Sequence, residues 1–498
     1  MLPINLYSIT QVEDFSKFRT YYEYCSQTKI KQRLRDYEII CLKEFVRILL
    51  SFKCNANAFK GYYYNYEIDQ IGKEFDLLRL MKDCVLNIEL KSDAVPIEKI
   101  EKQLVRNKYY LMALHREIVQ FCLNTSTKEV YILDTTGKIK LSSLEDLIAF
   151  VRMMEPKYEA NIDNLFEATQ FLVSPINTPE AYIRNEYFLT TQQEEFKICM
   201  LRKLAEQERP AYFAVSGQAG TGKTLFLFDL ARELTKSSRG CLIHCGNLAN
   251  GHNVINAAFP NLSIVPVKEI NSDFDFSVYE YIFVDESHRI WENPYELILK
   301  SVANNKSVCV FSYDARQFLS KQEYYRGISK RIQEIPGISS YKLTAKIRTN
   351  SVISEFIYSL FNTNKELTQN VKEYVSIEYA ANHEIADYYI KEYCKIGYKF
   401  INYTPSKYNF EELIDKFDCS ETSHSVLGQE FDNVIMLLDS HFAYRSDGFL
   451  VASRHPNPDY LFVQLLFQGV TRVRKKLCLV IVDNKELFYR ILEIVSSK

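Results

Sequence analysis

The sequence has little glycine, little proline and no long run of apolar residues. With 15 glycines and 13 prolines among 498 residues, it contains no Gly/Ser linker, low-complexity tract or internal repeat. No apolar stretch reaches the roughly 18 residues that a membrane-spanning helix requires, and the N-terminal segment has no signal-peptide pattern. Twelve cysteines are present, but they do not form the repeated pairs of a zinc site. We therefore expect a folded cytoplasmic protein with reduced thiols and no membrane contact.

An excess of charge of either sign is also missing. The net charge is −2 and the sequence pI is about 6.5, so any nucleic-acid contact has to use local patches. The length is sufficient for two to four domains. Turn-forming residues interrupt the helical patterns between about 150 and 188. We predict an N-terminal domain at 1–155, a linker at 156–188 and a larger C-terminal unit.

One motif identifies a nucleotide site. Residues 211–224 read AYFAVSGQAGTGKT, an apolar strand that runs into Gly217-x-x-x-x-Gly222-Lys223-Thr224, and a helical pattern follows. The glycines, including Gly220, let the backbone turn tightly enough for successive N–H groups to surround phosphate oxygens. Lys223 can reach the β and γ phosphates, and Thr224 offers its hydroxyl to Mg²⁺. This strand–loop–helix context predicts that the protein binds a nucleoside triphosphate.

Acidic residues at the end of a second apolar strand are an independent sign of an NTPase. The stretch YEYIFVDESHRI places Asp285 and Glu286 there, at the edge where α/β sheets hold their ligands. Asp285 is suited to hold Mg²⁺ through its water shell, and Glu286 to polarise the attacking water as a general base. The next strand ends in Asp314-x-x-Gln317. Gln317 can sense the γ-phosphate, although a solvated strand end has the same pattern.

The order of these motifs resembles that of superfamily 1 helicases, and specifically that of the Schlafen-like helicase domain. LTTQQ at 189–193 resembles the Q motif, the phosphate loop and DESH resemble motifs I and II, and DARQ resembles motif III. LTAKIRTN, HSVLGQEFDNVIML and QGVTRVRKKL resemble motifs IV, V and VI. The resemblance covers about residues 185–495. It implies that Gln193 reads adenine, Arg348 contacts the γ-phosphate, Glu430 lies near the ribose and Arg472 is the arginine finger.

The same resemblance implies two RecA-like lobes, which we place at 189–340 and 341–498. Leu427 is a departure, because motif V usually has Gln or Lys just before its glycine, here Gly428; one polar link between the ATP site and the nucleic-acid groove is thereby missing. About 75 residues separate motifs IV and V, too few for the accessory insertion of processive relatives. We expect a compact motor that translocates along a strand, opens a short duplex or only switches conformation with ATP.

The N-terminal domain contains a second set of candidate catalytic residues. Residues 61–93 read as a β-meander with Asp76 on one strand and Glu89 and Lys91 on the next, and these last two share a face because side chains alternate. Two carboxylates can hold one or two Mg²⁺ or Mn²⁺ ions that polarise a scissile phosphate and activate water, and Lys91 can stabilise the developing charge. A half-buried strand with solvated Glu and Lys has the same tripeptide, so a structural role is the alternative.

This arrangement resembles the PD-(D/E)xK nuclease superfamily, although Phe75 stands where a proline usually precedes the aspartate. In that superfamily a preceding helix often supplies another acidic metal ligand, for which Glu44 is the candidate. A glutamine on the following helix lies beside the metal site in related restriction-type nucleases, and Gln103 in QLVRNKYYL fits that place.

The expected fold class is α/β, with two RecA-like parallel-sheet lobes preceded by an α/β restriction-endonuclease-like domain. We expect an ATP-dependent helicase or translocase coupled to a metal-dependent endonuclease or exonuclease, acting on DNA rather than RNA in antiviral defence or DNA processing. Two alternatives are open: an ATP-gated nucleic-acid-binding switch or sensor without nuclease activity, and an RNA-directed nuclease. A homo-oligomer or a partner protein is compatible with each of them.

Overall fold

The chain folds into two units. The computed structural model describes residues 1–28, 34–68, 71–134, 136–153, 155–156, 161–166, 173–344, 351–405, 417, 421–453 and 460–496. Contacts divide the chain into Met1–Phe171 and Leu172–Lys498, a division that falls within the stretch predicted to be a linker. Within the described ranges, no helix is both long enough and apolar enough to cross a membrane.

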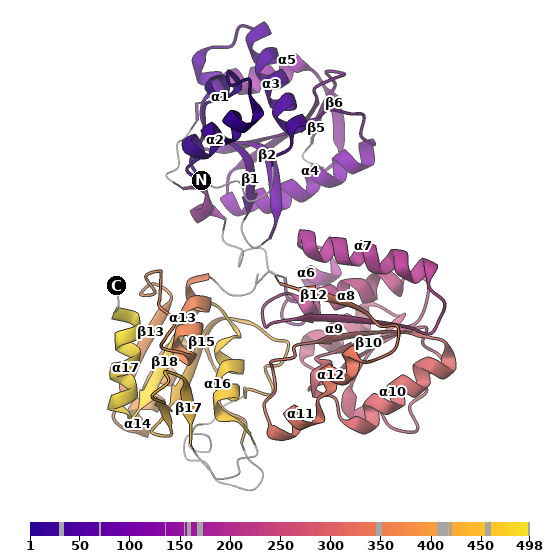
Figure 1. The fold of residues 1–498 in the computed structure, drawn as a ribbon, viewed down its shortest axis with the longest axis vertical. Coiled ribbons are helices and arrows are strands. Elements are labelled where there is room, and N and C mark those ends of the chain that lie inside the picture. The colour runs from indigo at the N-terminus through magenta and orange to yellow at the C-terminus, as the bar shows by residue number, and fades with distance from the viewer. Residues whose placement is uncertain are drawn as a thin grey trace. The chain divides into compact units, whose positions relative to one another are not determined.

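The first unit is built on one sheet with the strand order β1-β2-β3-β4-β5-β6. All neighbouring strands are antiparallel except β3 and β4, which are parallel. The strands are β1 (Tyr62–Ile68), β2 (Lys73–Leu80), β3 (Cys84–Lys91), β4 (Glu117–Asn124), β5 (Val130–Leu133) and β6 (Ile139–Ser142). The helices are α1 (Leu6–Thr10), α2 (Phe15–Ser26), α3 (Asp36–Ser51), α4 (Ile97–Leu111) and α5 (Leu144–Met153) (Figure 1).

Helix α4 connects the two parallel strands, which cannot be joined by a tight turn. Its Leu104 is fully buried in a small core with Cys122 on β4 and Leu133 on β5. Because residues three or four apart lie on the same side of a helix, this packing places Gln103 and Asn107 beside β3.

The second unit begins with a lobe whose sheet has the order β12-β7-β11-β10-β8-β9 and is entirely parallel. Its strands are β7 (Ala211–Gly217), β8 (Gly240–His244), β9 (Leu262–Pro266), β10 (Tyr281–Asp285), β11 (Val308–Tyr313) and β12 (Ser339–Leu343). Its helices are α6 (Pro179–Ile183), α7 (Thr191–Glu206), α8 (Lys223–Leu234), α9 (Asn250–Ala258), α10 (Glu292–Asn305), α11 (Lys321–Arg326) and α12 (Ile328–Gln333) (Figure 1).

Both faces of this sheet are buried, as is usual for parallel strands covered by crossover helices. On one face the core includes Phe226 of α8 and Ile255 of α9. On the other it includes Ile298 of α10 and Ile332 of α12. The apolar runs in the central strands β7, β8, β10 and β11 therefore reflect two-sided burial.

The second lobe has a smaller parallel sheet with the order β13-β18-β15-β14 and a separate antiparallel hairpin, β16-β17. Its strands are β13 (Val375–Ala380), β14 (Tyr398–Phe400), β15 (Phe431–Leu438), β16 (Phe442–Tyr444), β17 (Leu450–Ala452) and β18 (Val473–Val482). Its helices are α13 (Ser351–Phe361), α14 (His383–Lys395), α16 (Phe462–Val470) and α17 (Lys485–Ser496). The predicted α/β class with two parallel-sheet lobes is confirmed.

Candidate functional sites

The phosphate loop connects β7 to α8. Gly220 and Gly222 have φ values of +82° and +77°, in the left-handed region that favours glycine. The Lys223 ammonium donates to the carbonyl oxygens of Gly217, at 2.9 Å, and Gln218, at 3.1 Å. The positive side chain thus lies over a loop that opens the N-terminus of α8, where backbone N–H groups attract anions.

Thr224 and Asp285 form the oxygen cluster expected of a magnesium site. The Thr224 hydroxyl donates to Asp285 Oδ2 at 3.3 Å. Asp285 Oδ1 and Glu286 Oε2 are buried and have no hydrogen-bond partner among the described residues. Mg²⁺ prefers hard oxygen ligands and often takes only one or two from protein, with water and phosphate completing its shell. The residues present therefore fit Mg²⁺ that is shared with a bound nucleotide.

Glu286 lies just beyond β10 in a left-handed conformation, with φ +54°. Burial alone would raise the pKa of its carboxyl, but interactions with the positive groups around it, among them Lys223, Arg289 and Arg472, outweigh burial and lower the pKa to about 2. The carboxylate is consequently ionised at neutral pH, as a general base has to be.

His288 lies between Glu286 and the residue that follows β11, and the motif match did not assign it a role. The backbone N–H of Asp314 donates to His288 Nδ1 at 3.3 Å, and Nε2 lies 3.6 Å from Glu286 Oε2. Burial, together with nearby cations, lowers the pKa of His288 to about 3, so the ring is neutral at physiological pH. Its position in DESH, two residues after the candidate base, is the sequence signal that points to it.

Gln193 is fully buried and holds the phosphate loop in place. Its Oε1 accepts from the Thr190 N–H at 2.9 Å, which closes the capping box of α7. Its Nε2 donates to the carbonyls of Thr221 and Gly222 at 3.3 and 3.2 Å. Both ends of the amide are therefore engaged with backbone. Gln317 is also buried, and its Nε2 has no acceptor within the described part of the chain.

Residues of the second lobe approach the same site. Arg472 is fully buried, donates from Nε to the Gln468 carbonyl at 3.2 Å, and contributes to the lowered pKa of Glu286. The Glu430 backbone N–H donates to Asn177 Oδ1 at 3.2 Å. Arg348, the predicted motif IV arginine, lies outside the described residues.

A cavity of about 530 Å³ opens beside this site, lined by residues of both lobes. The Arg326 guanidinium lies 4.1 Å from the centre of the Trp291 ring, and the rings of His424 and Tyr460 are 4.8 Å apart. Lys268 also lines the cavity. We attribute most aromatics of this sequence to core filling, but Trp291 is 57% exposed. In the sequence, the basic and aromatic residues of RIW at 289–291 are the pattern that indicates a nucleic-acid contact here.

Comparison with known proteins bears on this part of the chain. Residues 210–397 match the family model "Schlafen group 3, DNA/RNA helicase domain". This stretch is a match to a helicase domain. It contains the phosphate loop, Asp285, Glu286 and Gln317, and it ends before Glu430 and Arg472. None of the curated proteins matches the chain.

Solved helicase structures show more distant likeness. The arterivirus nonstructural protein 10 (helicase) is 14% identical, with a TM-score of 0.32, over 56% of this chain and 61% of that one; this chain thus spans less than two thirds of its length. Bacteroides sp Pif1 in complex with ADP-AlF4 is 12% identical, with a TM-score of 0.31, over 61% of this chain and 96% of that one. The helicase-domain match therefore depends on the family model.

In the first unit, the structure brings Asp76, Glu89 and Lys91 together. Lys91 Nζ lies 3.8 Å from Asp76 Oδ2 and 3.6 Å from Glu89 Oε2. Asp76 Oδ2 also accepts from the Leu90 N–H at 2.8 Å. Burial and the charge of Glu89 raise the pKa of Asp76 well above its usual value, despite the opposing effect of Lys91. The charge of Lys91 therefore offsets only part of the effect of burial and of Glu89 on Asp76.

Helix α4 holds Glu89 in a fixed orientation. Gln103 Nε2 donates to Glu89 Oε2, and Asn107 Nδ2 donates to Glu89 Oε1 at 2.7 Å. Both oxygens of a carboxylate that is only 1% exposed are thus bound by amides. Gln103 lies beside the predicted metal site, and Asn107 is a further residue of this site that sequence spacing alone did not assign to a role.

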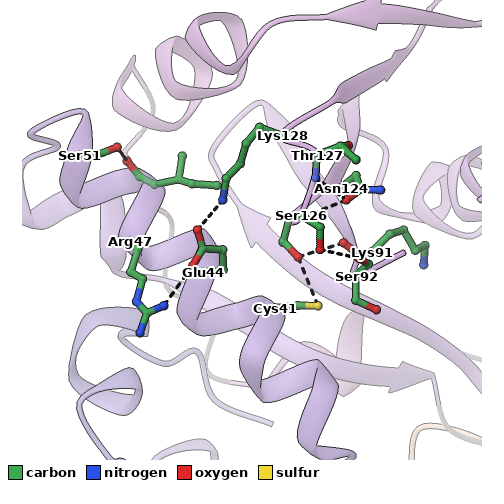
Figure 2. Close-up of polar contacts among 12 residues, drawn as sticks. Cys41, Glu44, Arg47, Ser51, Lys91, Ser92, Asn124, Ser126, Thr127 and Lys128 are labelled. Atoms are coloured by element: carbon green, nitrogen blue, oxygen red, sulfur yellow. Dashed lines mark hydrogen bonds and ion pairs between the residues drawn. The ribbon is translucent and has the colours of Figure 1, made fainter. Parts of the chain in front are cut away.

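Glu44 does not reach this cluster. Figure 2 shows its carboxylate between Lys128 and Arg47, with which it forms ion pairs. The cavity of about 380 Å³ beside Asp76 and Lys91 is lined instead by Glu38 and Cys41 from the same helix, α3. Helical spacing places residues three apart on one face, so Glu38 is the acidic residue that α3 presents here. No group of three His, Cys, Asp or Glu side chains in the described ranges is close enough to hold a metal ion.

Proposed function

We propose that the second unit is an ATP-driven nucleic-acid helicase or translocase and that the first unit is a metal-dependent nuclease. The observation that carries the first part is the charge arrangement around Glu286. Lys223 from the phosphate loop and Arg472 from the second lobe both lower the pKa of this carboxyl. Hydrolysis and the position of the second lobe are therefore linked through one buried site.

The residues of this site suit phosphoryl transfer. Lys223 neutralises the β and γ phosphates, while Thr224 and Asp285 hold Mg²⁺, which supplies further charge neutralisation when bound. Glu286 orients the attacking water and accepts its proton, and His288 holds Glu286 in position. Arg472 stabilises the charge that develops on the transferred phosphoryl group. Gln193 fixes the loop through its bonds to the backbone of Thr190, Thr221 and Gly222, and reading adenine, its expected role, would require it to release one of them. Gln317 contacts the γ-phosphate through its amide nitrogen, which has no acceptor among the described residues.

The cavity lined by Trp291 is the proposed path of the nucleic-acid strand. Arg326 and Lys268 offer positive charge to the phosphates, and Trp291 offers an exposed ring on which a base can stack. Stacking tolerates any sequence because every base has a π-face. This property suits a motor that moves along nucleic acid rather than one that recognises a sequence.

The first unit has the chemistry of a phosphodiesterase. If Mg²⁺ or Mn²⁺ binds here, Asp76 and Glu89 would be its protein ligands and the ion would polarise the scissile phosphate, while Lys91 would stabilise the negative charge that develops on it. Gln103 and Asn107 hold the Glu89 carboxylate. We favour DNA as the substrate and antiviral defence or DNA processing as the setting, because a motor and a nuclease on one chain can cut what the motor moves.

An ATP-gated binding protein without nuclease activity is the second candidate. Its support is the pairing of Lys91 with both carboxylates, which satisfies their charge without a metal ion. In that case the first unit binds nucleic acid without cutting it, and ATP controls only the release of the nucleic acid.

ATPase measurements with single-stranded DNA, duplex DNA and RNA test the motor, with Lys223→Ala as the inactive control. We expect stimulation by at least one polymer, and its absence with all three would contradict the motor. Cleavage assays in Mg²⁺ and Mn²⁺ test the nuclease. Cleavage that Glu89→Gln abolishes would support it, whereas no cleavage of any polymer would favour the second candidate.

A further inference from the structure

His244 is buried against the acidic end of the ATP site. It ends β8, and the parallel register places it directly opposite Asp285 on β10. The imidazole is fully buried, and within the described ranges neither ring nitrogen has a hydrogen-bond partner. Nδ1 lies 3.6 Å from Asp285 Oδ2. A buried polar group without a partner costs free energy, so native structures retain few of them.

The surroundings of the ring leave it little freedom. A Cβ on Gly246 would lie 2.8 Å from His244 Nε2, and one on Gly428, whose φ is +72°, would lie 3.7 Å from Cε1. The ring of His252 packs against it with a centroid separation of 4.7 Å. Backbone therefore encloses the edge that carries Nε2, and the edge that carries Nδ1 faces the carboxylate.

The two oxygens of Asp285 have different surroundings. Oδ2 accepts from Thr224 and faces His244, whereas Oδ1 is buried without a partner among the described residues. An ionised carboxylate only accepts hydrogen bonds, and a neutral imidazole protonated at Nδ1 is a donor. Donors that bind a metal-ligating carboxylate from behind fix its orientation and tune the metal site.

We propose that His244 is a positioning residue that holds Asp285 for Mg²⁺ by donating from Nδ1 to Oδ2. The inference depends on the proposed ATP function of the same site. Oδ2 is then fixed by two donors, Thr224 and His244, and Oδ1 is directed at the hydration shell of the metal ion.

Two amide substitutions distinguish the contribution of Nδ1 of His244 from that of Nε2. In His244→Asn the side-chain amide occupies the place of Nδ1, and in His244→Gln it reaches the place of Nε2. The measurement is the ADP dissociation constant by calorimetry, in Mg²⁺ and in EDTA, whose ratio reports the coupling between metal and nucleotide. We expect His244→Gln to reduce this ratio about tenfold or more, as is typical when such an outer partner is lost, with ADP affinity in EDTA unchanged. His244→Asn should retain the coupling.

His252→Gln is the matched control, because His252 is equally buried but its Nδ1 accepts from the Ala249 N–H. Wild-type coupling in His244→Gln, or an equal loss in His252→Gln, would overturn the proposal. If His244→Gln does not fold, the comparison of His244→Asn with the similarly shaped His244→Leu replaces it, and only the leucine variant should lose coupling. Failure of the wild-type protein to bind ADP in Mg²⁺ would instead contradict the proposed function itself.

Discussion

Glu286 and Asp76 are acidic residues whose pKa values shift in opposite directions. Burial raises the pKa of each carboxyl, but cations from two lobes surround Glu286, whereas Asp76 has Glu89 beside it and only Lys91 to oppose that charge. The first carboxylate is therefore ionised at neutral pH. The pKa of the second is raised well above its usual value, and Lys91 offsets only part of that rise.

Glu286→Gln should separate nucleotide binding from hydrolysis. The amide retains the size of the side chain but cannot accept the proton of the attacking water, so we expect kcat to fall by about 10²- to 10⁴-fold and ADP affinity to be unchanged. Single-turnover hydrolysis and calorimetry measure the two quantities. An equal loss in both would indicate a structural role for Glu286.

Glu38 and Glu44 should differ in their effect on cleavage. We expect Glu38→Gln to lower the rate about tenfold or more, the typical cost of disturbing residues around a metal site, because Glu38 lines the cavity beside Asp76. Glu44→Gln should retain the rate, since Glu44 pairs with Lys128 on the surface. Initial rates of cleavage of plasmid and single-stranded DNA measure the effect of each variant. The reverse order would mean that α3 presents a different face to the substrate.

At the scale of elements, the polar ends of buried parallel strands supply most of the ATP site. β7 leads into the phosphate loop, β8 ends at His244, β10 ends at Asp285, and Asp314 follows β11. The register of β10 with its two neighbours aligns these ends. Strands of a parallel sheet all end at the same edge, so residues far apart in sequence meet there.

Trp291, the N-cap residue of α10, should report the binding of a nucleic-acid strand directly. It is the single tryptophan of the chain, so a change in intrinsic emission on adding single-stranded nucleic acid comes from this cavity. Because base stacking contributes about 1–3 kcal/mol, Trp291→Ala should weaken strand affinity about 5- to 150-fold, measured by fluorescence anisotropy of a labelled strand. Trp291→Phe, the control, should retain most of it. Unchanged emission at saturating strand would place the path elsewhere.

At the scale of the whole molecule, the segment just after the first unit is held by both lobes of the second unit. A Cβ on Gly251 of α9 would lie 1.8 Å from the Ile176 carbonyl oxygen, and one on Gly428 of motif V would lie 2.9 Å from Ile176 Cδ1. Asn177 bonds through both polar atoms of its amide to the backbone of Glu430. The proposed movement of the lobes with ATP would therefore act on this segment.

Asn177→Ala should reduce the influence of ATP on cleavage. Hydrogen bonds of this kind contribute about 1 kcal/mol each, so we expect the ratio of cleavage rates with and without ATP to fall about fivefold or more, while strand-stimulated ATPase activity persists. Asn271→Ala, a control on the exposed surface of the first lobe, should leave the ratio unchanged. An unchanged ratio in Asn177→Ala would show that the two activities are coupled by another route.

The sequence by itself determined the α/β class, the phosphate loop and the acidic strand end, because each depends on residues that are neighbours in the chain or on one strand. It also placed Asp76, Glu89 and Lys91 on adjacent strands, since a tight meander leaves little choice of register. Only the tertiary structure decided that α3 presents Glu38 to the cavity, that His244 faces Asp285 and that the charge of Arg472 acts on Glu286. These contacts depend on how distant elements pack, and local periodicity does not specify such packing.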